Sequence, residues 1–66
     1  MSETPAAKLA RLLPGARVFL VSERLIFADI VMVQEWRVER DGRVLADGHS
    51  ERQAVDRACF AWGGER

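Results

Sequence analysis

The sequence predicts an α+β domain in which an N-terminal and a C-terminal helix pack on one face of a three-stranded antiparallel sheet, in the order α-β-β-β-α. Two observations carry this prediction. Asp41-Gly42 lies between two alternating runs, and Asp-Gly favours a type I′ hairpin turn because both central residues need positive φ. Ser50 followed by Gln53 forms a capping box, which marks the start of a helix. The 66 residues are expected to form a single domain, 1–66.

The elements follow in order along the chain. Thr4 followed by Pro5 suits an N-cap and a first helical position, and apolar residues then recur at helical spacing until Pro14-Gly15 ends the run. The β-branched and aromatic content predicts strands at 17–22 and 29–40, and a third strand at 43–47 returns from the Asp41-Gly42 turn. The link at 23–28 is left open, as either a loop or an extension of a strand.

A two-residue turn fixes the expected register. Arg40 should pair with Arg43, Val38 with Leu45, and Trp36 with Asp47. Trp36, Val38 and Leu45 are then expected to face the helices. The face open to solvent is expected to carry the following residues: Glu35, Arg37, Glu39, Val44 and Ala46.

The same alternation assigns the start of the second strand. It places Ile30 and Met32 toward the helices and Val31 and Val33 on the open face. A bulge near Gln34 would reverse that assignment.

The last helix is expected to cover the sheet with one apolar stripe and to end at Gly63-Gly64, where glycine is free to take the left-handed C′ conformation. The stripe consists of Val55, Ala58, Cys59 and Trp62, bordered by Ala54 and Ala61. Phe60 falls on the opposite side. It is either a contact residue or an ordinary exposed aromatic that the tail partly covers.

Composition excludes several classes of function. Ten Lys and Arg balance ten Asp and Glu, which argues against a protein that binds the nucleic-acid backbone through clustered positive charge. Cys59 is the single cysteine and is expected to be a small packed hydrophobe rather than half of a disulfide. One His and one Cys do not supply the ligands of a zinc site. No targeting segment and no apolar run of membrane-spanning length is visible, so a cytoplasmic protein is expected.

The sequence offers no catalytic constellation. His49 is adjacent to Ser50, and neighbouring residues in an extended or capping segment point apart, so no Ser-His relay is implied. A phosphate-binding glycine loop, paired carboxylates in an apolar setting and metal-ligand spacings are also missing. We therefore expect no enzyme activity, no cofactor and no metal.

The junction of third strand and second helix resembles the double-stranded-RNA-binding domain. That family shows a Gly, then Ser, Lys-Lys, Ala, Lys and paired small residues, and its Gly and Ser-Ala spacing is kept by Gly48, Ser50, Ala54, Ala58 and Cys59. The order helix-strand-strand-strand-helix is similar too. The resemblance implies this fold and contact with duplex RNA, for which Arg40, Arg43 and Arg52 are the candidate residues.

The positions of the family's lysines depart from its pattern. Glu51 stands at the first, Arg52 matches the second in charge, and Val55 replaces the third. The family's Gly-Pro-x-His loop is also missing between the first two strands, at 22–28.

These features favour a small non-catalytic protein-binding module, with a protein partner or a second copy of the chain as its ligand. The expected contact residues lie on the open sheet face (Val31, Val33 and Arg37) or on the outer side of the last helix (Phe60). The size of the chain is also similar to that of phage and mobile-element accessory proteins or inhibitors, such as anti-CRISPR proteins, by analogy of size alone. The alternative is a degenerate nucleic-acid-binding domain of the double-stranded-RNA type.

Overall fold

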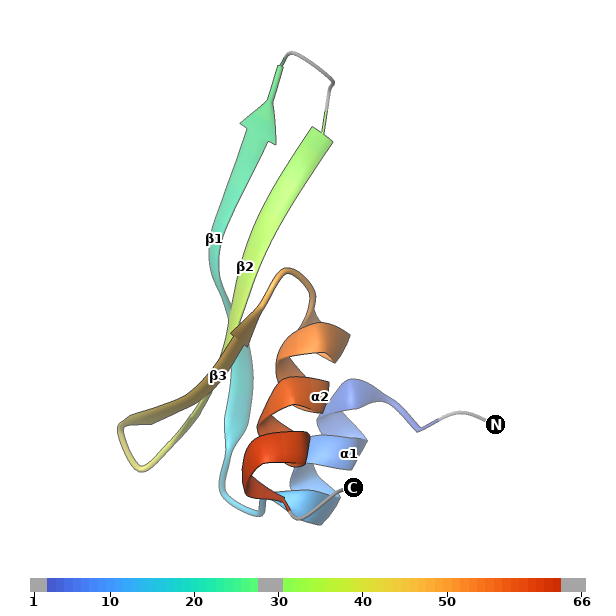
Figure 1. Ribbon diagram of the computed structural model, residues 1–66, viewed down its shortest axis with the longest axis vertical. Coiled ribbons are helices and arrows are strands. Elements are labelled where there is room, and N and C mark those ends of the chain that lie inside the picture. The colour runs from blue at the N-terminus through green and yellow to red at the C-terminus, as the bar shows by residue number, and fades with distance from the viewer. Residues whose placement is uncertain (1–2, 28–30, 64–66) are drawn as a thin grey trace.

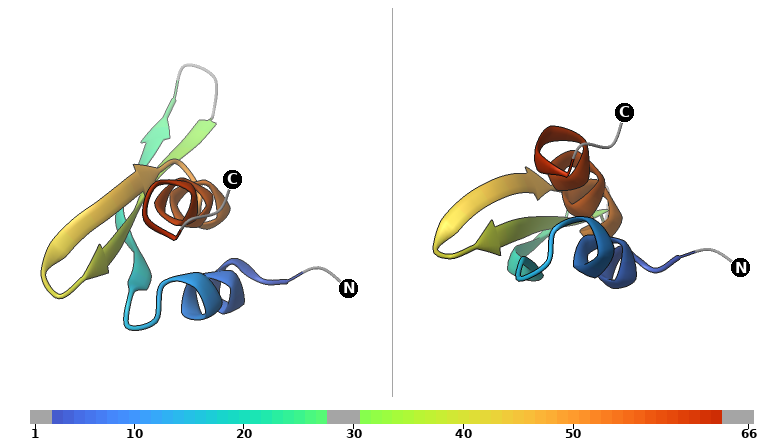
Figure 2. Two further views of the ribbon diagram at one scale, coloured as in Figure 1. Left: turned by 60° about the horizontal axis from the view of Figure 1, so that its bottom comes forward. Right: turned by 90° about the horizontal axis from the view of Figure 1, so that it is seen from below.

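The computed structural model describes residues 3–27 and 31–63. Its elements are α1 (Pro5–Leu12), β1 (Arg17–Ile26), β2 (Val31–Arg40), β3 (Arg43–Gly48) and α2 (Glu51–Trp62), in the expected order α-β-β-β-α. The strands form one antiparallel sheet in the order β1-β2-β3. α2 packs against the sheet, and α1 lies beside α2 near the start of β1 (Figures 1 and 2).

Local signals set the helix boundaries and the hairpin turn. The Thr4 hydroxyl accepts a hydrogen bond from the Ala7 N–H, and the Ser50 hydroxyl accepts one from the Gln53 N–H, so both predicted N-caps are confirmed. The Gln53 side chain departs from the standard capping box, because it accepts from the His49 N–H instead of the Ser50 N–H. Asp41 and Gly42 both have positive φ, as the predicted turn requires.

The C-terminal end of α2 differs in detail from the expectation. The helix ends at Gly63, which has an ordinary negative φ of −92° as its C-cap. The predicted left-handed C′ position falls on Gly64, which lies outside the described residues.

The core forms where α2 and α1 meet the lower half of the sheet. Val38 is its central strand residue, and the Cys59 side chain is fully buried. The buried apolar set is Leu9, Leu13, Val38, Leu45, Ala54, Val55, Ala58 and Cys59. Trp62, predicted to complete the stripe of α2, is instead half exposed, although its indole is hydrogen-bonded to β3.

The register of β2 and β3 corrects part of the prediction. Arg40 pairs with Arg43 as expected, but Val38 pairs with Ala46 and Trp36 with Gly48. The cause is a bulge at Leu45, which adds one residue to β3. Ala46 therefore packs against the core instead of facing solvent, whereas Val44 stays on the open face beside Glu39.

β1 is longer than predicted, since residues 23–26 extend the strand rather than forming a loop. A second bulge lies in β1 at Val21, and β2 itself runs without interruption from Val31 to Arg40. Regular alternation along β2 therefore puts Val31 and Val33 on the face opposite buried Val38. Met32 was predicted to be inside but is 51% exposed. Ile30 lies outside the described residues.

Within the described part of the chain, no helix has the length and apolar character needed to cross a bilayer.

Candidate functional site

The upper half of the β1–β2 hairpin extends past both helices and past β3 (Figure 1). β3 ends at Gly48, which pairs with Trp36, so the residues of β2 before Trp36 have β1 as their only paired strand. We call residues 21–27 together with residues 31–35 the arm. It is a two-stranded ribbon with no helix over it.

The arm carries most of the exposed apolar surface. Six of the ten large apolar side chains that the described residues expose belong to it: Val21, Leu25, Ile26, Phe27, Val31 and Met32. Phe27 is 82% exposed at the far end. A two-stranded ribbon is marginally stable alone in water, and three or more strands or a packed helix are normally needed. This ribbon therefore lacks the cover that such a surface usually has.

The two faces of the arm have different neighbours. Leu25 pairs with Met32 on the face that continues toward the helices, and Ile26 pairs with Val31 on the open face. Arg24 pairs with Val33 on that open face, one step closer to the core. The open face of the arm therefore has an apolar end followed by a mixed, partly charged stretch.

Polar contacts fasten the arm to the rest of the sheet. The Gln34 amide Nε2 donates to Glu23 Oε2 at 2.9 Å, and the Trp36 indole donates to Gln34 Oε1 at 3.0 Å. These bonds lie on the helix side of the ribbon, because Gln34 and Trp36 alternate with the open-face residues. They align the strands without covering the apolar side chains.

Arg37 forms ion pairs with two carboxylates of its own chain. Its Nε donates to Asp47 Oδ1 at 2.9 Å, and its Nη2 lies 3.8 Å from Glu35 Oε1. The hydrogen bond to Asp47 raises the pKa of the Arg37 guanidinium above its usual value. Arg37 therefore joins β2 to β3 on the open face, and its charge is matched within the chain.

Phe60 lies apart from the open-face residues. It is 61% exposed on the outer side of α2, as expected, and α2 packs on the opposite side of the sheet from Val31 and Val33. The predicted contact residues thus form two separate surfaces, with Val31, Val33 and Arg37 on one and Phe60 on the other.

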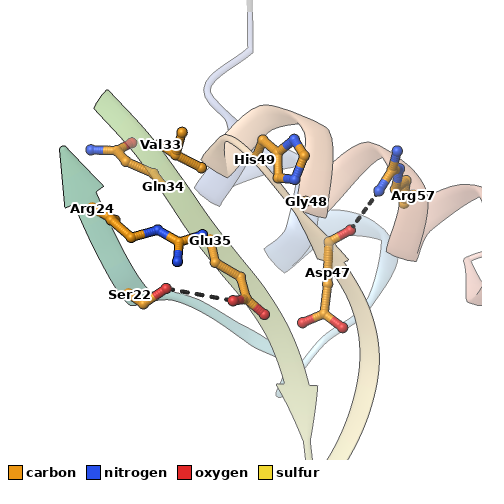
Figure 3. A pocket seen from close by; sticks show the side chains of 9 residues that line it. All are labelled: Ser22, Arg24, Val33, Gln34, Glu35, Asp47, Gly48, His49 and Arg57. Carbon is orange, nitrogen blue, oxygen red and sulfur yellow. Dashed lines mark hydrogen bonds between the residues drawn. The ribbon is translucent and has the colours of Figure 1, made fainter. Parts of the chain in front are cut away.

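A polar notch of about 220 Å³ lies at the base of the arm (Figure 3). Residues of all three strands and of the following helix line it, among them Arg24, Glu35, His49 and Arg57. The Arg57 Nη1 donates to the main-chain oxygen of Asp47 at 3.1 Å. The notch mixes both signs of charge, and among the described residues no cluster of three or more His, Cys, Asp or Glu is placed to hold a metal ion.

The basic residues named for the alternative function are not gathered into one patch. Arg40 and Arg43 face each other next to the β2–β3 turn, where they line a depression of about 260 Å³ with Trp62. Arg52 lies in the first turn of α2, beyond the other end of β3. The two ends of β3, a strand of six residues, are separated by roughly 20 Å.

The sequence prediction missed the arm. A comparison of the lengths of the strands and of the helix that covers them indicates it. β1 and β2 each have 10 residues, about 33 Å of strand. α2 has 12 residues and spans only about 18 Å. A helix of that length leaves nearly half of the hairpin uncovered, which explains why Met32 is exposed.

Comparisons with protein-family models, curated proteins and solved structures give no match for this chain.

Proposed function

We propose that this chain is a small non-catalytic protein-binding module that acts through the open face of the arm. The observation that supports this most directly is Val31, which is 45% exposed on an apolar two-stranded ribbon that no helix covers. An apolar centre with a polar rim is the usual anatomy of a protein interface. Here Ile26, Val31 and Val33 provide the centre, and Arg24 and Glu35 provide the rim.

Binding a partner would also stabilise the arm, because it would bury apolar side chains that are now exposed to water. Each apolar side chain of the arm that loses contact with water contributes about 25 cal/mol per Å² of area buried. A partner that covers several of them supplies the packing that a two-stranded hairpin lacks. Phe60 offers a smaller second surface. The other large exposed apolar residue of α2 is Trp62, and its indole is already hydrogen-bonded to β3.

A matched pair of valine variants tests the proposal. Val31 and Val44 are both 45% exposed on the open face, but Val44 lies on β3 at the far end of the sheet. Val31→Asp should abolish partner capture from the native host while the circular dichroism spectrum is unchanged. Val44→Asp should leave capture intact. Equal capture by both variants would overturn a role for the arm and make Phe60→Ser the next variant to measure.

Duplex-RNA binding is the alternative function, and the α-β-β-β-α order supports it. In this case Arg52 at the start of α2 and Arg40 and Arg43 at the hairpin tip would contact phosphate. The zero net charge and the carboxylate of Glu51 in the first turn of α2 favour protein binding instead.

A further inference from the structure

Building on the proposed function, we propose that the open face of the arm binds a second copy of this chain. The two copies form a symmetric dimer whose two-fold axis runs along the hairpin, between β1 and β2. The open faces of the two sheets stack on each other, and the helices of both copies lie on the outside.

The first argument is the amount of exposed surface. The chain exposes 4753 Å², whereas a compact monomer of 7.4 kDa is expected to expose about 4,200 Å². The radius of gyration is 12.8 Å, against about 10.8 Å for a compact chain of this length. An interface that covered an area equal to this excess, roughly 550 Å² on each copy, would bury about 1,100 Å² in total, which is near the lower limit of a specific interface.

The second argument is self-complementarity. A two-fold axis along the hairpin places each β1 residue over the β2 residue that already pairs with it in its own chain. Ile26 then lies over Val31 of the second copy, and Val31 lies over Ile26 of that copy. Stacked sheets lie about 10 Å apart, which side chains of this size fill. The apolar end of each arm therefore meets the apolar end of the other.

Two of the four other open-face pairs are complementary in the same way. Arg17 pairs with Glu39 in the β1–β2 register, so the axis brings Arg17 of each copy over Glu39 of the other. Ser22 pairs with Glu35, so a hydroxyl likewise meets a carboxylate. Opposite charges that face each other across an interface fix its register and disfavour other arrangements.

Face-to-face stacking is favoured over edge-to-edge pairing. Glu23 and Arg24 lie at the middle of the outer edge of β1 within the arm. A symmetric antiparallel pairing of two such edges, centred there, would place Glu23 against Glu23 or Arg24 against Arg24. Like charges directly opposite each other destabilise a strand pair, and charged residues on an edge strand are a common protection against such pairing.

Charge reversal tests the geometry, with the mass measured by sedimentation equilibrium between roughly 10 μM and 1 mM. The native chain should dimerise in this range. Arg17→Glu and Glu39→Arg should each weaken dimerisation at least about tenfold, because each puts two like-charged pairs across the axis. An equimolar mixture of the two variants should dimerise again, since both intermolecular pairs in the heterodimer are then opposite in sign.

The mixture separates contacts between copies from contacts within a chain. In the mixture each variant keeps two like charges at the paired positions 17 and 39 of its own chain, so recovery can arise only from contacts between molecules. A mixture that stays monomeric overturns this geometry. If a reversal unfolds the chain, the valine variants decide instead: Val31→Asp must dissociate the dimer and Val44→Asp must not, because β3 lies outside the stacked strands.

The dimer and the proposed function fail in different ways. A native chain that is monomeric up to about 1 mM overturns the second copy as partner. If it nevertheless captures a host protein in a Val31-dependent manner, the protein-binding function stands with a different ligand. If Val31→Asp dimerises as the native chain does, the arm is not the dimer interface, and capture of a host protein alone then decides the proposed function.

Discussion

The Trp62 indole donates a hydrogen bond to the main-chain oxygen of Leu45 at 2.9 Å. Leu45 is the extra residue of the β3 bulge, between the pairs Val38–Ala46 and Glu39–Val44. A bulge leaves its extra residue outside the regular ladder of hydrogen bonds, and here the last residue of α2 provides a partner for the carbonyl group. The bond ties the C-terminal end of α2 to the sheet at the point where the register shifts.

Loss of that bond should be measurable. Trp62→Phe keeps an aromatic ring but removes the donor, and we expect the free energy of unfolding to fall by about 1 kcal/mol. Urea denaturation measures it. Phe60→Leu, two residues away and exposed on the other side of the helix, is the control and should change stability by less than about 0.5 kcal/mol. Equal effects for the two variants would mean that the indole bond contributes nothing.

The cap of α2 provides a second prediction. The Ser50 hydroxyl accepts from the Gln53 N–H at 3.0 Å, so Ser50→Ala should cost about 1 kcal/mol in unfolding free energy. Thermal melting should show the loss readily, because a domain of this size is only marginally stable. Ser50→Thr is the control, since threonine also caps a helix through its hydroxyl and should keep most of the stability. A melting temperature unchanged by Ser50→Ala would show that the cap is not formed.

Gly48 occupies a position with no room for a side chain. A Cβ built there would lie 2.6 Å from the main-chain nitrogen of Ala54, so the junction of β3 and α2 must shift to admit an alanine. We expect Gly48→Ala to destabilise the fold by more than about 2 kcal/mol. Gly42→Ala is the comparison: its Cβ would meet nothing within 4 Å, but its φ of +78° strains any side chain and should cost about 1 kcal/mol. The opposite order in denaturation would contradict the close approach.

The local features of the fold could be predicted from sequence, and the long-range ones could not. Thr4, Ser50 and Asp41-Gly42 act on residues at most a few positions away, so their chemistry determines the outcome. The bulge at Leu45 is accompanied by a contact with Trp62, 17 residues later in the chain. Alternation alone carries no information about such a contact, which is why the predicted partner of Val38 was wrong by one residue.

The candidate site was predictable in the same partial way. The alternation of β2 places Val31 and Val33 opposite Val38 because that strand contains no bulge. Whether a face is covered depends instead on where the helices end relative to the strands. Met32 shows the difference: its side of the sheet was assigned from the pattern, but its burial required a helix that does not reach the arm.

The ion pair between Glu3 and Arg11 predicts a pH effect at the N-terminal end of α1. Arg11 donates to both Glu3 carboxylate oxygens, at 2.9 and 2.8 Å, and this hydrogen bonding lowers the pKa of Glu3 below 4.5. The contribution of the ion pair to stability is therefore fully present above the ordinary pKa of an unfolded glutamate. It is lost as the pH falls through the lowered pKa of Glu3 in the folded chain. An NMR titration should show the lowered pKa in the native chain and a higher one in Arg11→Ala. An unchanged Glu3 pKa in that variant would exclude the pair.

The last prediction concerns nucleic acid. A backbone-driven RNA contact requires positive charge gathered where phosphate lies, and its affinity must fall steeply with salt. Arg52 has Glu51 beside it in the first turn of α2, and the charges of Arg40 and Arg43 lie at the other end of β3. We therefore expect no binding to duplex RNA tighter than about 1 μM at roughly 0.15 M salt, measured by gel shift. Glu51→Lys, which reverses the charge at the helix N-terminus, is the matched variant and should tighten any residual nonspecific binding. Submicromolar binding by the native chain that disappears in Arg52→Ala would contradict this prediction and establish the RNA-binding alternative.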